Sequence, residues 1–387
     1  MSLGIGEDNP VSALDESLIM KRTSYRDADE LRTKLTHWFS RVLGPESSPR
    51  LSPLKAPGKA GMSSETLLFD MDWTENGKQR SGRFVARLPP PMDAFPIFPR
   101  YDFDLQVGVM RLVGGKSQVP VPMVPWQERA SDTLGVPFFV MERIDGEMVP
   151  DSPPYVFGGW LLEASQEQQQ QVQHQLVAIL AGIHGIEATP EETAFLRIEQ
   201  PGDTPLQRHF AREKALHEWG RNGMRFTLIE RLFDWLEARW PEREGPAVIN
   251  WGDARPANVL WRDFRATAVL DWELAAMAPR EMDVGYLIFF HRYFHHVAQI
   301  MAGTDAMPDF LRRDDVVTAY ERMTGARLQE IDWFITYGLL QQAIVETRLS
   351  QRRIQFGEME RPANLDEYIY CRGLIQQVLD GRANLWA

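Results

Sequence analysis

Two aspartates and an asparagine stand at spacings that suit metal and proton chemistry. Asp253 and Asn258 lie five residues apart, and Asp271 follows the next pair of apolar segments. Carboxylate and amide oxygens suit Mg²⁺, which usually keeps several waters and phosphate oxygens beside its protein ligands. A carboxylate next to such an ion can accept a proton from an attacking hydroxyl group. The three residues therefore predict a magnesium site that leaves Asp253 free to act on a hydroxyl.

A short hairpin would bring these side chains together. Two apolar segments, residues 259–261 and 268–270, are separated by a polar turn, which is typical of paired antiparallel strands. Asn258 stands at the entry of this hairpin and Asp271 at its exit. Strand pairing would therefore place both at the same end of a rigid ribbon, with Asp253 in the loop that leads into it.

The rest of the chain divides into a sheet-rich part and a helical part. Apolar segments at 66–69 and 84–87 flank Asn76-Gly77, a dipeptide that strongly favours a hairpin turn, and residues 136–141 indicate a buried strand. The sequence therefore predicts a small, mainly antiparallel sheet over residues 45–145, followed by a larger helical part. Helical spacing of apolar residues is found over 25–43, 160–186, 206–240 and 327–355, and 102–114 indicates a short helix.

Length and composition exclude several classes of protein. The 387 residues correspond to about 2.6 ordinary domains, so two or three packed units are expected. The net charge of −12 argues against binding to a nucleic-acid polymer through a broad basic surface. One cysteine excludes a disulfide framework and multi-cysteine metal sites. No apolar run approaches the roughly 18 residues of a membrane span, and the first residues lack a signal-peptide pattern, so a cytoplasmic protein without a membrane partner is expected.

The order Asp-x-x-x-x-Asn, hairpin, Asp resembles the catalytic core of protein-kinase-like phosphotransferases. The Trp-Glu pair after Asp271 and the segment Pro-Arg-Glu-Met-Asp-Val-Gly at 279–285 resemble the aminoglycoside phosphotransferase family, in particular a branch related to the kinase-like domains of acyl-CoA dehydrogenase proteins. The resemblance spans about residues 30–350. It implies an α+β, bilobal protein-kinase-like fold, with a small antiparallel-sheet amino lobe over 1–143 and a larger, mainly helical carboxyl lobe over 144–387.

The resemblance also implies a role for each residue of the constellation. Asp253 matches the catalytic aspartate, and Asn258 and Asp271 match the metal ligands. Arg255 stands where protein kinases have a lysine that faces the transferred phosphate, so it is expected to be a second catalytic residue. Asp283 matches an aspartate that braces the catalytic loop, and its expected role is structural.

The small residues of segment 58–66 resemble the family's phosphate-covering turn, where backbone N–H groups approach phosphate oxygens. Arg87 ends the second strand of the first hairpin, where the family has a basic residue that binds the α- and β-phosphates. The backbone of Glu142 and Ile144, between the lobes, would meet the adenine. The residues expected to bind ATP are Gly61, Ser63, Ser64, Thr66, Arg87, Glu142 and Ile144.

Two residues depart from the family pattern. Trp251 stands where the family usually has histidine, and Gln106 stands near the glutamate that orients the phosphate-binding basic residue. The leading hypothesis is an ATP- and Mg²⁺-dependent kinase for a hydroxyl group of a small molecule. The departures motivate one alternative, a catalytically weak or inactive nucleotide-binding regulator. An aminoglycoside resistance kinase is a second alternative, and a homodimer is left open.

Several reactive residues outside this constellation are expected to be structural. His184 should pack and hydrogen-bond near the catalytic loop, and Cys371 should be a buried thiol. Arg348, Arg352 and Arg353 are expected to form the solvated end of a helix.

Overall fold

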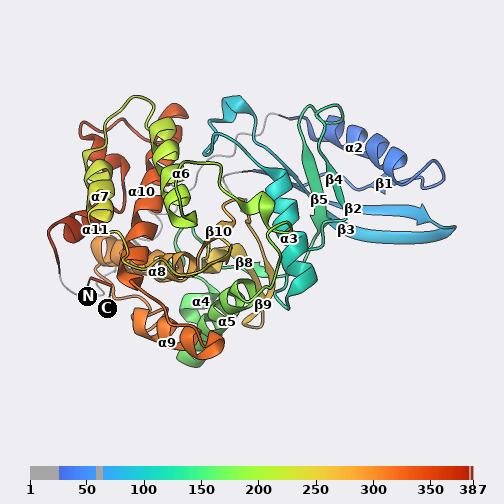
Figure 1. Ribbon diagram of the computed structural model, residues 1–387. Coiled ribbons are helices and arrows are strands. Elements are labelled where there is room, and N and C mark those ends of the chain that lie inside the picture. Colours follow the sequence, from blue (N-terminus) through green and yellow to red (C-terminus); the bar gives the residue numbers. More distant parts are fainter. Residues whose placement is uncertain (1–25, 58–63, 383–384, 387) are drawn as a thin grey trace, which may run out of the picture.

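A five-stranded sheet forms the smaller part of the molecule (Figure 1). The computed structural model describes residues 26–57, 64–382 and 385–386. The strands pair antiparallel in the order β1-β2-β3-β5-β4. Their bounds are β1 (Arg50–Leu51), β2 (Glu65–Glu75), β3 (Lys78–Leu88), β4 (Trp126–Glu128) and β5 (Phe138–Glu142).

The hairpin predicted at Asn76-Gly77 joins β2 and β3. Both residues have positive φ, 50° for Asn76 and 72° for Gly77, which is the backbone of a type I′ turn. The two strands pair without interruption from Glu65↔Leu88 to Glu75↔Lys78. This register fixes which residues lie beside Arg87 at the far end of the ribbon.

Helices cover both faces of the sheet (Figure 1). On one face lies α2 (Ala28–Val42), which begins at the N-cap Asp27 and packs Trp38 and Phe39 against the sheet. The other face meets α3 (Phe103–Lys116), whose Phe103 ring lies 5.1 Å from that of Phe139. Because side chains alternate along a strand, β2, β3 and β5 supply residues to two separate cores.

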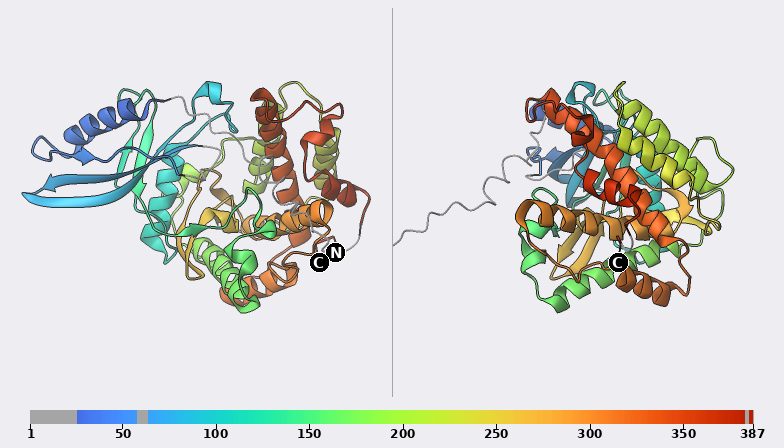
Figure 2. Two further views of the ribbon diagram at one scale, coloured as in Figure 1. Left: turned by 180° about the vertical axis from the view of Figure 1, so that it is seen from behind. Right: turned by 90° about the vertical axis from the view of Figure 1, so that its left-hand side faces the viewer.

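The larger part of the molecule is mainly helical (Figure 2). The predicted helix over 160–186 is divided because Ser165 caps a new helix through a capping box with Gln168. The predicted helix over 206–240 is likewise divided, at a turn in which Asn222 and Gly223 have positive φ. The helices are α4 (Trp160–Glu163), α5 (Gln166–His184), α6 (Pro205–Gly220), α7 (Thr227–Glu237), α8 (Glu281–Ala302), α9 (Arg313–Thr324), α10 (Ile331–Gln355) and α11 (Arg372–Leu379).

Two small sheets lie inside this helical part. One pairs β7 (Ala247–Asn250) with β10 (Ala276–Pro279). The other has the order β6-β8-β9 and contains the predicted hairpin. Its bounds are β6 (Glu147–Met148), β8 (Val259–Arg262) and β9 (Arg265–Val269). Within the described part of the chain, no helix has the length and apolar character that a membrane span requires.

The segment 89–102, between β3 and α3, crosses from the sheet to α6 and α10. The Arg348 guanidinium of α10 lies between the rings of Phe95 and Trp219, at 3.7 and 4.4 Å, and Nε donates to the Pro96 carbonyl at 2.9 Å. The prediction of a solvated helix end is therefore wrong for Arg348 and Arg352, the latter being 8% exposed. Periodicity within α10 could not indicate this, because a segment distant in the sequence covers the helix.

Candidate active site

The hairpin that begins after Asn258 and ends before Asp271 has the predicted geometry. Val259 pairs with Val269, and the Leu270 backbone N–H donates to the Asn258 carbonyl at 2.8 Å. Asp271 therefore follows directly after a residue bonded to Asn258. A one-turn 3₁₀ helix, Pro256–Asn258, connects Arg255 to the start of β8. The entry and exit of the ribbon thus lie side by side, as the spacing predicts.

Asp283, on the first turn of α8, braces the loop that follows β7. Its carboxylate accepts the backbone N–H groups of Trp251 at 2.7 Å and Gly252 at 2.8 Å. His184 Nε2 lies 3.1 Å from the same carboxylate, and His184 Nδ1 lies 2.7 Å from the Tyr320 hydroxyl. His184 is thus a packed residue that acts through Asp283 on the loop, in agreement with the sequence prediction.

Trp251, which stands where the resemblance leads us to expect histidine, is buried and 1% exposed. Its indole Nε1 donates to the Leu270 carbonyl at 2.8 Å, and its ring lies 5.9 Å from that of Trp272. The indole therefore ties the start of the catalytic loop to the residue before Asp271. Trp251 therefore hydrogen-bonds to the residue before Asp271 and packs against the residue after it.

Asp253 is held by several donors. Asn258 Nδ2 donates to Asp253 Oδ2 at 2.6 Å and to its carbonyl at 3.0 Å, and Arg255 Nε donates to Oδ2 at 3.1 Å. Burial, together with the nearby Asp253 carboxylate, raises the pKa of Tyr286 well above its usual value. Because Asn258 binds through its nitrogen, its amide oxygen remains for a cation. Asp253, Arg255 and Asn258, all proposed from the sequence, therefore form one hydrogen-bonded group.

Arg87 reaches from the sheet to Asp271. Its Nη2 donates to Asp271 Oδ1 at 3.0 Å, with side chains only 11% and 18% exposed. Asp271 itself has φ of +57°, which turns the chain sharply at the end of the hairpin. Among the described residues no hydrogen bond joins Arg87 to Gln106, and Arg87 Nε and Gln106 Nε2 are both buried without a partner. Arg87 thus faces the proposed metal ligand, and not the helix residue.

Asp151 is a charged neighbour that sequence reasoning missed. Its Oδ2 accepts a hydrogen bond from Arg255 Nη1, so Arg255 lies between Asp151 and Asp253. Burial raises the pKa of Asp151 to about 6, although the Arg255 guanidinium acts to lower it. Burial alone would lower the pKa of Arg255, but the two carboxylates raise it above its usual value. No motif marks Asp151, a lone acid in a proline-rich segment.

The start of β2 lies beside Arg87, because Thr66 pairs with Arg87 across the hairpin. Residues 50–55 run antiparallel to 68–72, and the pairing of Lys55 with Leu68 lies next to this end of the sheet. Ser64 is buried, and its hydroxyl has no partner among the described residues. Gly61 and Ser63, also predicted to bind ATP, lie outside the described residues.

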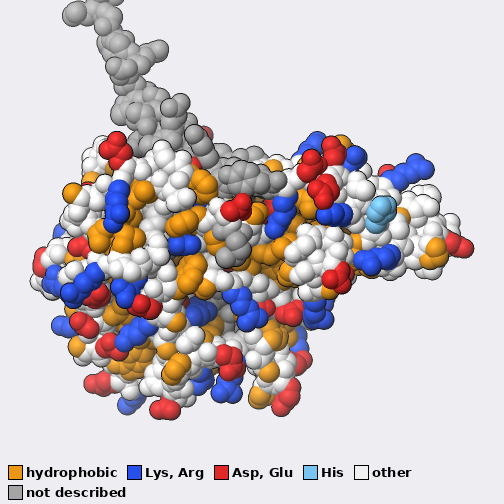
Figure 3. Space-filling model, turned by 90° about the horizontal axis from the view of Figure 1, so that it is seen from above, with side chains coloured by type: hydrophobic (Ala, Val, Ile, Leu, Met, Phe, Trp, Pro, Cys, Tyr) orange, Lys and Arg blue, Asp and Glu red, His pale blue; other side chains and the backbone are white. Residues whose placement is uncertain are grey.

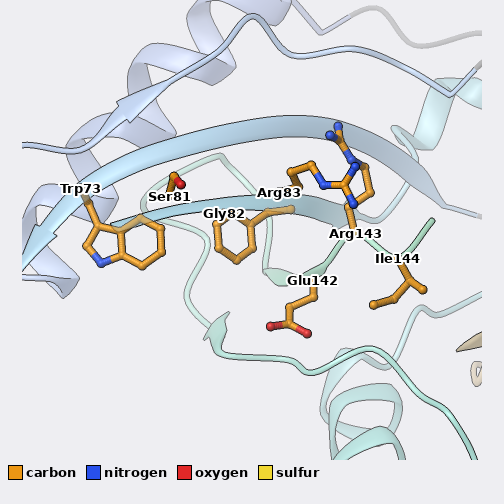
Figure 4. A pocket seen from close by; sticks show the side chains of 8 residues that line it. Trp73, Ser81, Gly82, Arg83, Glu142, Arg143 and Ile144 are labelled. Carbon is orange, nitrogen blue, oxygen red and sulfur yellow. The ribbon is translucent and has the colours of Figure 1, made fainter. Parts of the chain in front are cut away.

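Glu142 and Ile144 lie where β5 leaves the sheet for the helical part. The Arg143 N–H donates to the Arg83 carbonyl at 2.9 Å, which closes the strand pair at this point. Glu142 and Ile144 line a cavity of about 260 Å³ together with Trp73 and Gly82 (Figure 4). Glu142 pairs with Phe84, three residues before Arg87, so strand alternation places its side chain on the opposite face from Arg87. The Glu142 side chain therefore points away from Arg87.

The donor set fits a magnesium ion better than a zinc ion. In the described residues no group of three or more His, Cys, Asp or Glu side chains could hold a metal ion. Zinc sites commonly use such groups. One carboxylate of Asp271 and one amide oxygen of Asn258 form a smaller set, which suits Mg²⁺ because water and phosphate oxygens complete its octahedron.

Comparisons with known proteins agree with this arrangement. The chain is 22% identical over 307 residues to the probable acyl-CoA dehydrogenase IBR3 of Arabidopsis thaliana, covering 76% of this chain and 35% of that protein. It thus spans about a third of that relative's length. Among solved structures, a "putative aminoglycoside phosphotransferase" of Ralstonia eutropha has a TM-score of 0.59 at 17% identity, covering 90% of this chain and 97% of the other.

A thermostable mutant of aminoglycoside phosphotransferase APH(4)-Ia, in a ternary complex with AMP-PNP and hygromycin B, has a TM-score of 0.50 at 14% identity and covers 91% of this chain and 99% of its own. These likenesses confirm the predicted bilobal protein-kinase-like fold. The sequence profile of the phosphotransferase enzyme family matches residues 71–323, well over half of the chain. The protein therefore belongs to the phosphotransferase enzyme family.

Proposed function

We propose that this phosphotransferase transfers the γ-phosphate of ATP to a hydroxyl group of a small molecule, with Mg²⁺ as the metal ion. One observation carries the proposal. Arg87 extends from the sheet onto Asp271, at the same end of the hairpin where Asn258 and Asp253 are hydrogen-bonded to each other. A cation, two metal-ligand oxygens and a carboxylate base are the groups that phosphoryl transfer requires.

ATP would lie between the sheet and the helical part. Segment 58–66 would cover its phosphates, Arg87 would contact the α- and β-phosphates, and the backbone of Glu142 and Ile144 would meet the adenine. The pairing of Thr66 with Arg87, and of Lys55 with Leu68 beside it, supports this placement. The AMP-PNP complex of the APH(4)-Ia mutant supports a nucleotide site in this fold.

Asn258 and Asp271 would hold Mg²⁺ through oxygen atoms. When bound, the ion neutralises charge on the phosphates and fixes their orientation. Arg87 would then share its present partner, Asp271, with the ion and turn its remaining nitrogens to the phosphates. The buried Arg87 Nε, which has no partner among the described residues, supports a ligand on this side chain.

Asp253 would orient the acceptor hydroxyl and take up its proton as the new P–O bond forms. Asn258 and Arg255 hold its carboxylate in a fixed position, which is the main requirement of a reaction that depends on alignment. Arg255 would place positive charge beside the transferred group. The acceptor would lie over the helical part.

A panel of acceptors tests the proposal. Purified protein is incubated with Mg²⁺, ATP and, in turn, aminoglycosides, sugars, choline-like alcohols, hydroxy acids and hydroxyacyl-CoA thioesters, and phosphate on each acceptor is measured. The last two classes are included because relatives are named acyl-CoA dehydrogenases. We expect one class to be phosphorylated. Asp253→Ala should lose about 10²–10⁴-fold in rate and keep ATP binding.

Asp234→Ala, an exposed change on α7, serves as the matched control and should retain full activity. Full activity of Asp253→Ala would contradict the role of Asp253. ATP binding by a wild-type protein that transfers phosphate to no acceptor of any class would favour the alternative of a nucleotide-binding regulator. Transfer to aminoglycosides alone would favour the resistance kinase.

A further inference from the structure

Asp151 lies outside the set of residues to which the proposed function gives a role, yet it contacts Arg255 directly. We propose that Asp151 is a positioning residue for phosphoryl transfer, which holds the Arg255 guanidinium so that one nitrogen, Nη2, faces the transferred phosphoryl group. This inference rests on the proposed function. It adds a residue from the connection between the two parts of the molecule to the catalytic group.

Three contacts fix the Arg255 guanidinium. Nη1 donates to Asp151 Oδ2, Nε lies 3.0 Å from Asp253 Oδ1, and the guanidinium lies over the Phe290 ring at 4.9 Å. Nη2 forms no hydrogen bond to a residue in the described part of the chain. An arginine held at two nitrogens and one face presents its third nitrogen in a single direction. This is the geometry of a preorganised donor for an anionic group.

The position of Asp151 is set by the catalytic hairpin itself. Asp151 follows β6, which pairs with β8 through Met148↔Leu260. Downstream, the Tyr155 hydroxyl bonds to His291 on α8 at 2.8 Å, and α8 also carries Phe290. Asp151 is therefore anchored on both sides to the elements that surround Arg255, and this anchoring does not depend on the nucleotide.

Asp151 also divides the nitrogens of Arg255 between two carboxylates. Asp151 takes Nη1, and Nε lies 3.0 Å from Asp253 Oδ1 and 3.1 Å from Oδ2, so one nitrogen serves both oxygens of Asp253. Hydrogen bonds between a guanidinium and carboxylates are stronger than those between neutral groups, so the two acids hold the guanidinium firmly. Nη2 is left for a further anionic group.

If the pair of Asp151 and Arg255 had only a structural role, its loss would have a different effect on ligand binding. The side chains of Asp151 and Arg255 are 28% and 19% exposed, so loss of one charge would destabilise the fold whether or not the pair acts in transfer. A structural role affects all ligands alike. A positioning role affects only the complex that contains a planar phosphoryl group, because the proposal places Nη2 against that group and not against ADP.

The test compares the affinity for MgADP with that for MgADP plus tetrafluoroaluminate, which mimics the phosphoryl group in transfer. Calorimetry is performed on wild type, Asp151→Asn, Arg255→Gln and the double variant. We expect MgADP affinity to stay within about twofold. The tetrafluoroaluminate complex should weaken by about 10- to 100-fold in both single variants, and no further in the double variant, because both changes remove the same donor.

Asp145→Asn is the matched control, since Asp145 also pairs with an arginine, Arg83 at 2.6 Å, but lies on the exposed connection. Asp151→Ser replaces Asp151→Asn if the latter unfolds. Wild-type behaviour of the Asp151 variant, equal weakening of both complexes, or additive losses in the double variant would each overturn the inference. A wild-type protein that binds neither complex would instead contradict the proposed function.

Discussion

Trp251 and Gly252 show how single residues set the shape of the catalytic loop. The Trp251 indole bonds to the carbonyl before Asp271, and its backbone N–H, like that of Gly252, bonds to Asp283. Gly252 has φ of +89°, and a Cβ at this position would lie 2.4 Å from the Leu274 carbonyl oxygen. The loop can therefore reach both partners only with glycine here.

Gly252→Ala should destabilise the protein and lower its activity. The left-handed backbone and the close carbonyl together should cost about 3 kcal/mol in the free energy of unfolding, and Asp253 should move with the loop. Gly135→Ala is the matched control, because Gly135 has φ of +80° but nothing within 4 Å of the added Cβ. Denaturant unfolding of both variants measures the difference. Equal losses would show that backbone strain, and not the contact with Leu274, limits this position.

At the scale of elements, α8 carries both Asp283, which hydrogen-bonds to the loop after β7, and a buried histidine, His291. Asp283 on its first turn orders the loop, and His291, two turns later, lies between the Tyr155 hydroxyl at 2.8 Å and the Met307 carbonyl at 3.1 Å. The Met307 carbonyl can only accept, so Nε2 donates to it, and the neutral ring then accepts at Nδ1 from the tyrosine hydroxyl. Burial lowers the pKa of His291 to about 3.

This histidine should make stability depend on pH. Unfolded histidine binds a proton near pH 6.5, whereas folded His291 does so only near pH 3. The unfolded state therefore binds more protons between these values, and stability present above pH 6.5 is lost as the pH falls. Between pH 7 and 5 the loss from this residue should be about 2 kcal/mol. His291→Gln should flatten the dependence, measured by denaturant unfolding at both values, whereas exposed His174→Gln should not.

Local patterns in the sequence predict elements well where one element supplies the signal. The hairpin turns at Asn76-Gly77 and after Arg262 could be placed, as could the convergence of Asn258 and Asp271, because strand pairing follows from local chemistry. Asp151 and the contacts of Arg348 could not be predicted. Both depend on segments that meet only after folding, and a lone acid or an arginine on a helix carries no periodic signal.

At the scale of the whole molecule, the site is built from two parts that meet at several points. Segment 89–102 packs on Arg348, and Arg87 bonds to Asp271 across the boundary. Seen from above, hydrophobic side chains gather along this boundary (Figure 3). The chain carries a net charge of −12, yet Arg87 and Arg255 place two cations at the site. In the proposed function, phosphate binding would therefore depend on local and not on overall charge.

The central claim, that the two parts hold MgATP between them, is tested most directly by calorimetric titration of ATP with and without Mg²⁺. Wild type is compared with Asp271→Asn and with Asp263→Asn, an exposed change in the turn of the same hairpin. We predict that Mg²⁺ strengthens ATP binding in wild type and in Asp263→Asn. In Asp271→Asn the ratio of ATP affinity with Mg²⁺ to that without it should be about 10- to 100-fold smaller. No ATP binding by wild type at millimolar nucleotide, or an unchanged effect of Mg²⁺ in Asp271→Asn, would contradict the account.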